Sequence, residues 1–126
     1  MSLSNTFETR ALQWIFTADA VTRPTAWYVA LYTVAPTDTG GGTECSGTSY
    51  ARQSVSLSVS GNLATNNAAV EFPAAGSSWG TIVAAGVFDA SSGGNLIAYG
   101  NLTASKTIDT GDVLRIPTGD LDITLD

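Results

Sequence analysis

The last third of the chain, from Ser77 to Asp126, most constrains the fold. It is a series of short apolar runs, and each run is closed by a turn that contains glycine, such as Gly93-Gly94 and Gly111-Asp112. Short runs of strand-forming residues between turn residues predict antiparallel strands. Reactive side chains are almost absent from this segment. The pattern therefore predicts a small β scaffold that works by surface contact rather than by chemistry.

The rest of the chain continues this pattern, with about eight short strands expected in all. Residues 27–33 are apolar on both alternating sets, which is typical of a central strand covered on both faces, and we expect the helix described below or another subunit on its second face. In residues 52–59, Val55, Leu57 and Val59 alternate with serines, so this strand is expected to be half-buried. Further strands are expected at 68–72, 81–88, 95–99, 107–108, 113–116 and 121–125, with Gly86 marking a bulge or a close approach.

These strands predict a mainly β fold. We expect a two-sheet antiparallel β-sandwich, jelly-roll-like or immunoglobulin-like, that forms a single domain over residues 1–126. Residues 5–17 predict one N-terminal α-helix, with Asn5 as its cap and Glu8 three residues later. An apolar stripe along this helix, made by Phe7, Ala11, Trp14 and Ile15, is expected to be buried, against the chain's own sheet or against a neighbouring subunit.

Composition excludes several classes of function. The net charge is −6, and the five basic residues are scattered, whereas a nucleic-acid-binding protein needs clustered Lys and Arg. No apolar run approaches the roughly 20 residues of a membrane span, and no signal peptide is visible. We therefore expect no nucleic acid and no membrane among the partners.

The sequence shows no catalytic constellation. The chain has no histidine, so a serine or cysteine nucleophile lacks its usual base. Cys45 is the only cysteine, which excludes an intrachain disulfide, and we interpret it as a free loop thiol. An acidic cluster could be formed only by five aspartates near the end of the chain, Asp109, Asp112, Asp120, Asp122 and Asp126. They lack calcium-loop spacing, and we interpret them as solvated turn and edge residues. We expect no enzyme activity, no cofactor and no metal.

The longest loop, residues 36–49, is the main candidate for a contact surface. It contains three consecutive glycines and has no evident apolar anchor, and loops of this length are usually either functional or mobile. Arg52 follows the loop and is expected to pair with a carboxylate, either across a subunit contact or within the chain. Trp79 lies between serines and a glycine, so it is the one tryptophan expected at the surface. The candidate contact residues are Thr39, Gly41, Glu44, Cys45, Arg52 and Trp79.

An ordered set of short motifs along the chain resembles a family of small tailed-phage virion proteins, tail-fibre-like or capsid decoration proteins. The motifs are Tyr28-Val29-Ala30-Leu31-Tyr32-Thr33, Ser49-Tyr50-Ala51-Arg52-Gln53, Trp79-Gly80-Thr81-Ile82, Gly86-Val87-Phe88-Asp89, Gly93-Gly94-Asn95-Leu96, Gly111-Asp112 and Gly119-Asp120-Leu121. The resemblance implies a non-enzymatic part of a virion, assembled in the bacterial host cytoplasm.

Three hypotheses for function follow. The first is a capsid decoration or cement protein that binds the phage major capsid protein and self-associates as a homo-oligomer. The alternative within the same class is a tail-fibre, baseplate or other tail component, whose partners are tail proteins. The second alternative is a β-sandwich module that binds a carbohydrate or a receptor, with a tryptophan stacking on sugar.

Overall fold

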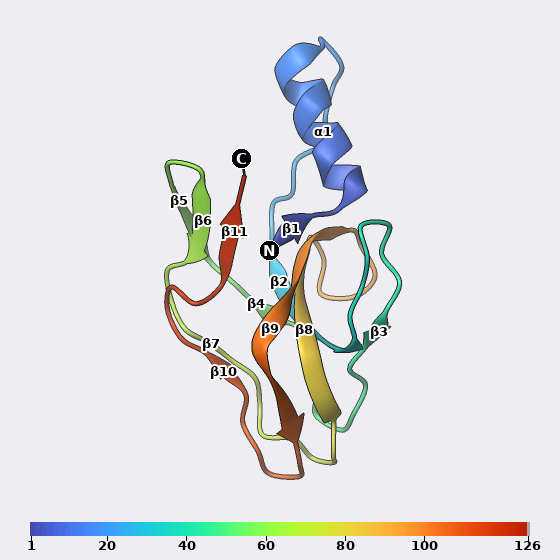
Figure 1. Ribbon diagram of the computed structural model, residues 1–126, viewed down its shortest axis with the longest axis vertical. Helices are drawn as coiled ribbons and strands as arrows, with labels where there is room; N and C mark the ends of the chain where they lie inside the picture. The colour runs from blue at the N-terminus through green and yellow to red at the C-terminus, as the bar shows by residue number, and fades with distance from the viewer. Residues whose placement is uncertain (126) are drawn as a thin grey trace.

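The computed structural model describes residues 1–125 and shows a β-sandwich with one N-terminal helix (Figure 1). The larger sheet has the strand order β1-β9-β8-β2-β3, and β4 also pairs with β2. The second layer is made of two smaller sheets, β11-β6-β5 and β10-β7. All strand pairs are antiparallel. The predicted fold class is therefore confirmed.

The elements of the larger sheet come from two separate parts of the chain, residues 2–54 and 80–108. Their bounds are β1 Ser2–Leu3, β2 Tyr28–Val34, β3 Thr43–Glu44, β4 Gln53–Ser54, β8 Gly80–Phe88 and β9 Leu96–Ile108, and the helix α1 spans Asn5–Phe16. The second layer contains β5 Leu57–Ser60, β6 Leu63–Asn66, β7 Val70–Glu71, β10 Arg115–Ile116 and β11 Asp122–Thr124. Two strands expected at 95–99 and 107–108 are one long strand, β9. The strand expected at 52–59 is divided into β4 and β5, and Val59 on β5 is exposed.

The central strand β2 is covered on both faces, as its doubly apolar pattern predicted. Val29 and Leu31 lie in the main core, against side chains of the second layer such as Phe72. Ala30 and Tyr32 lie in a smaller cluster on the opposite face. The helix, one of the two covers expected for this second face, does not lie over it, because Phe7 packs into the main core instead.

Gly86 on β8 marks a close approach. A side chain at this position would come within 2.9 Å of a Leu96 methyl group and 3.1 Å of the Tyr32 ring. The register shifts of β8 against β9 lie elsewhere, between Ile82 and Ala84 and between Val87 and Phe88. Glycine therefore lets the neighbouring side chains close over this face of the sheet.

The start of the helix differs in detail from the prediction. Ser4, not Asn5, is the N-cap residue, and it makes no side-chain capping bond. Its hydroxyl instead donates to the Leu96 carbonyl at 2.6 Å, and its backbone N–H donates to Ile97 at 2.8 Å. These bonds anchor the first turn to β9, and α1 then projects beyond the end of the sheet (Figure 1).

The buried stripe expected along the helix is only partly present. Phe7 is buried, but Trp14 and Ile15 are exposed, because the second half of α1 extends past the surface that would have covered them. Of the two expected possibilities for Trp14, burial against the chain's own sheet is therefore wrong. Trp79, expected at the surface, is buried instead. The N-terminal end of β8 places its ring under the 45–50 segment, where its Nε1 donates to the Thr48 carbonyl at 3.0 Å.

Candidate functional site

Four of the six candidate contact residues lie together at the base of the 36–49 loop. Arg52 donates to both carboxylate oxygens of Glu44, at 2.9 Å from Nε and 2.8 Å from Nη2. The Tyr50 hydroxyl donates to the same carboxylate at 2.8 Å and accepts the backbone N–H of Leu31 at 3.0 Å. We name Glu44, Tyr50 and Arg52 the charged cluster. It resolves the two open alternatives for Arg52 in favour of an ion pair within the chain.

Arg52 also holds a second segment in place. Its Nη1 donates to the carbonyls of Ala90 and Gly93, at 2.9 and 2.8 Å, in the turn between β8 and β9. Its guanidinium lies 3.7 Å from the centre of the Phe88 ring, which is a cation–π contact. The side chain is only 8% exposed, whereas the other ion pair of residues 1–125, Arg115–Glu71, is 56% and 63% exposed. Arg52 therefore joins the loop, the sheet and the turn.

Burial and hydrogen bonding shift the titration of this cluster. Burial alone would raise the pKa of Glu44, but the hydrogen bonds from Arg52 and Tyr50 outweigh it and hold the pKa below its ordinary value. Burial raises the pKa of Tyr50 far above its usual range, and it raises the pKa of Tyr32 to about 12, with the Glu44 charge adding to both shifts. At neutral pH the charged cluster therefore contains the Glu44 carboxylate, the Arg52 guanidinium and the neutral Tyr50 phenol, and Tyr32 is likewise neutral.

Cys45 and Trp79 complete the base of the loop as packing residues. Both are buried, and the Tyr50 ring meets the Trp79 ring edge-on at 5.5 Å between centroids. Burial raises the pKa of the Cys45 thiol, which keeps it protonated and poorly nucleophilic. The expectation that the loop lacks an apolar anchor is wrong, because Cys45 enters the core and Pro36 is also buried.

Only the tip of the loop presents candidate contact residues to solvent. Thr39 and Gly41 are exposed, and the backbone N–H and carbonyl groups of Thr37 and Gly40 bond each other at 2.9 Å in both directions. The Tyr99 hydroxyl on β9 donates to the Asp38 carboxylate, which ties the tip to the larger sheet and raises the pKa of Tyr99. The structure therefore offers a tethered tip above a buried base.

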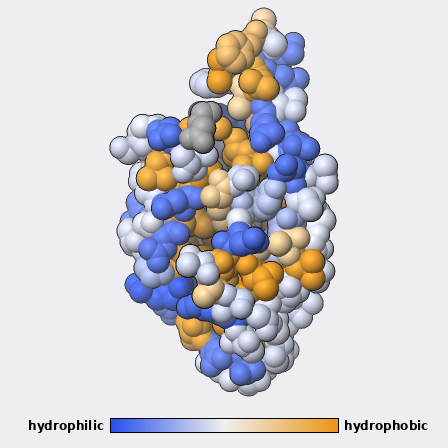
Figure 2. Space-filling view, in the orientation of Figure 1, coloured by the Kyte–Doolittle hydropathy of each residue, from blue (hydrophilic) through white to orange (hydrophobic). Residues whose placement is uncertain are grey.

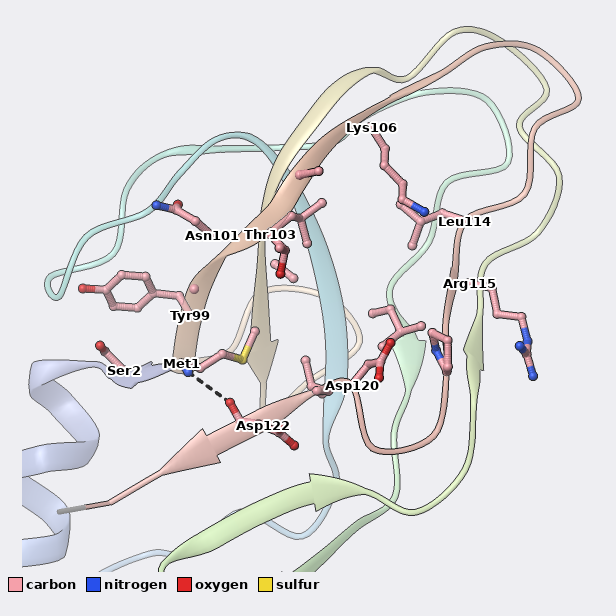
Figure 3. Close-up of a pocket in the computed structure, with 17 residues that line it drawn as sticks. Met1, Ser2, Tyr99, Asn101, Thr103, Lys106, Leu114, Arg115, Asp120 and Asp122 are labelled. Carbon is pink, nitrogen blue, oxygen red and sulfur yellow. Dashed lines mark hydrogen bonds between the residues drawn. The ribbon is translucent and has the colours of Figure 1, made fainter.

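A groove of about 850 Å³ lies between β9 and the 114–122 segment (Figure 3). Tyr99, Asn101 and Lys106 line it from β9, and Asp120 and Asp122 line it from the other side. Lys106 and Leu114 extend toward each other from opposite walls in Figure 3. The Met1 ammonium group donates to the Asp122 backbone carbonyl at 3.0 Å. Sequence reasoning missed this groove, since its walls are distant in sequence.

Within residues 1–125, the aspartates considered for an acidic cluster are not all brought together. Asp120 and Asp122 share the groove, whereas Asp112 accepts the backbone N–H of Asp109 at 2.9 Å within a separate turn. Asp126 lies outside the described residues. Within residues 1–125, no three His, Cys, Asp or Glu side chains are grouped closely enough to hold a metal ion. The helix in the same part of the chain lacks the length and apolar content of a membrane span.

The one buried ion pair of residues 1–125 is satisfied within the chain, and the surface offers a loop tip, a groove and an apolar helix. The family model described as "Podophage GP4 fiber I protein gp80" matches residues 2–124, and the chain belongs to this family. No curated protein matches the chain. The predicted resemblance to small tailed-phage virion proteins is therefore confirmed.

Proposed function

We propose that this protein is a non-enzymatic component of a phage fibre and is attached to other virion proteins. The observation that carries the proposal is the family match over residues 2–124, because the protein that gives the family its description is a fibre protein. The sequence-based hypothesis favoured a capsid decoration protein and kept a tail component as its alternative. The family description favours the alternative, and the virion remains the proposed location after assembly in the host cytoplasm.

The candidate site supports a role in contact. Glu44 and Arg52 bond each other, Cys45 is buried with a raised pKa, and the chain has no histidine to act as a base. The exposed loop tip around Thr39 and Gly41 is held from below and from β9. A rigid base under an exposed tip positions a contact surface without losing entropy on binding.

Separation of phage heads from tails tests the proposed location. Purified virions would be dissociated gently, the head and tail fractions isolated, and the protein quantified in each by mass spectrometry. Gold-labelled antibody against the protein would locate it on intact particles by electron microscopy. We expect the protein in the tail fraction, with gold at the fibres. Recovery with the heads, with gold spread over the capsid, would overturn the fibre proposal and support a decoration protein.

Binding of a carbohydrate or receptor is a second candidate function, favoured by the β9 groove. The groove combines the Lys106 ammonium group and the Asp120 carboxylate with apolar side chains such as Leu114, as sugar sites combine polar and apolar groups (Figure 3). Isothermal titration against host-surface glycans tests it, comparing wild type with Lys106→Ala and with Ser91→Ala, an exposed control in the 90–95 turn. Saturable binding that is lost in Lys106→Ala alone supports this function, and absence of binding by wild type overturns it.

A further inference from the structure

The second half of helix α1 is an apolar surface that nothing within residues 1–125 covers. Leu12, Trp14, Ile15 and Phe16 are 59%, 74%, 57% and 76% exposed. We name these four residues the apolar helix end. Figure 2 shows hydrophobic surface at the projecting tip of the molecule. A helix that is apolar around most of its circumference is normally buried, and an exposed patch of large apolar side chains marks a contact.

The helix presents two different apolar faces. Phe7, Ala11 and Trp14 recur at helical spacing and, with Val21 and Pro24, line a groove of about 400 Å³ beside the helix. Leu12 and Phe16 are four residues apart and therefore share another face. At about 100° per residue, Phe16 is rotated by about 200° from Trp14, so the two faces are nearly opposite. One face is a groove, and the other is a ridge.

The charges on the two faces are complementary. Arg10 and Arg23 line the groove, and within residues 1–125 neither is within ion-pair distance of a carboxylate. Glu8 lies one turn before Leu12 on the ridge face and is exposed. The groove is thus basic and apolar, and the ridge is acidic and apolar. Two of the five basic residues of the protein are placed in this one groove.

We propose that the groove of one molecule receives the Leu12–Phe16 ridge of a second copy, and that this head-to-tail contact closes a ring of more than two copies. The ridge and the groove lie on nearly opposite sides of the same helix, so each copy has one of each to offer. Glu8 of the ridge approaches Arg10 and Arg23 of the groove. A lipid surface fits less well, because the net charge of −6 opposes anionic headgroups and the helix carries only one basic residue.

Mass measurement on the purified protein tests the ring. Wild type would be compared with a ridge variant, Leu12→Gln plus Phe16→Gln, and a groove variant, Trp14→Gln, by light scattering across a concentration series. Glutamine is a good helix former, so circular dichroism should be unchanged. Val59→Thr, which alters an equally exposed apolar residue on β5, is the matched control. We expect wild type and control to form one discrete ring, and either helix variant to weaken association by about tenfold or more.

Mixing the two variants tests the head-to-tail arrangement. The intact ridge of the groove variant can enter the intact groove of the ridge variant, so an equal mixture should give heterodimers that neither variant forms alone. A wild type that stays monomeric at high concentration, a twofold dimer, an unlimited filament or a mixture without heterodimers would each overturn the proposal. So would loss of the ring in Val59→Thr. The measurement uses free protein, so it stands or fails independently of the location in the virion.

Discussion

The charged cluster and the apolar helix end reverse the usual placement of side chains, because in this protein a charged pair is buried and large apolar residues are exposed. The cluster places a guanidinium and a carboxylate under the loop, where the hydroxyl of Tyr50 and two backbone carbonyls complete their hydrogen bonding. The helix end places four large apolar side chains in solvent. Charges buried within one chain are stabilising only when all partners are present. The base of the loop is therefore complete within one molecule, whereas nothing within residues 1–125 covers the helix end.

The largest expected effect separates two tryptophans, one beside the charged cluster and one in the helix end. Trp79→Ala should lower the free energy of unfolding by about 5 kcal/mol, because it leaves a cavity under Tyr50 and removes the bond to Thr48. Trp14→Ala should change it by less than about 1 kcal/mol in dilute protein. Urea unfolding followed by circular dichroism measures both. Equal losses at the two positions would show that the helix end is packed within the monomer.

The next effect tests the completeness of the charged cluster. Arg52→Ala should cost about 3–4 kcal/mol, because it leaves the Glu44 carboxylate half-buried without its cation and uncovers Phe88. Arg115→Ala removes the exposed pair with Glu71 and is the matched control, expected to cost less than about 1 kcal/mol. The same unfolding measurement compares them. A loss in Arg52→Ala no larger than in the control would mean that burial of the pair adds nothing.

A smaller effect appears on acidification. The folded pKa of Glu44 is lowered, so its contribution to stability is present above the ordinary glutamate pKa of about 4.3 and is lost as pH falls through the folded value. The stability difference between wild type and Glu44→Gln should therefore shrink as the pH is lowered below that value. Thermal unfolding of the two proteins across acidic buffers measures it. A difference that stays constant down to the acid unfolding limit would contradict a lowered pKa.

The smallest effect on stability is expected at the loop tip. Thr39→Ala combined with Gly41→Asn should change the free energy of unfolding by less than about 1 kcal/mol, since both positions are exposed and asparagine tolerates the left-handed backbone of Gly41. Exchange of residues 39–47 for a Gly-Ser linker should instead unfold the protein, because it removes Glu44 and Cys45.

The tip variant also tests the proposed contact with the virion. We expect weaker retention of the variant than of wild type when reconstituted particles are washed at rising salt, while wild type is retained because few charges are available for the contact. Retention of the variant equal to that of wild type, or loss of wild type at moderate salt, would remove the loop tip from the contact surface.

The sequence was most informative where one local pattern had one structural meaning. The doubly apolar run of β2 predicted burial on both faces, and this is confirmed by its two clusters. The glycine at position 86 predicted a close approach, which Tyr32 and Leu96 provide. Turns that contain glycine predicted the succession of strands. These features depend on neighbours in sequence, so alternation and backbone preference are enough to detect them.

The sequence was least informative where burial depends on distant segments. Periodicity predicted an apolar stripe on α1 but not where the sheet ends, so it could not show that Trp14 extends past the chain's own sheet. Trp79 was assigned to the surface because its neighbours are polar, although the 45–50 segment folds over it. The β9 groove is lined by Lys106 from one wall and by Asp120 from the other, and no local sequence pattern indicates that these two walls face each other.

Strand alternation, glycine turns and the absence of histidine are local or compositional properties, so the sequence alone was enough to predict a lightly charged β scaffold. Only the tertiary structure decided how its few polar residues are used. Asn66 bonds four backbone groups, of Ala68, Pro117, Gly119 and Leu121, and Arg52 bonds Glu44 and the 90–93 turn. A buried polar group takes whichever partners the fold brings within about 3 Å, and that distance is set by packing between remote segments.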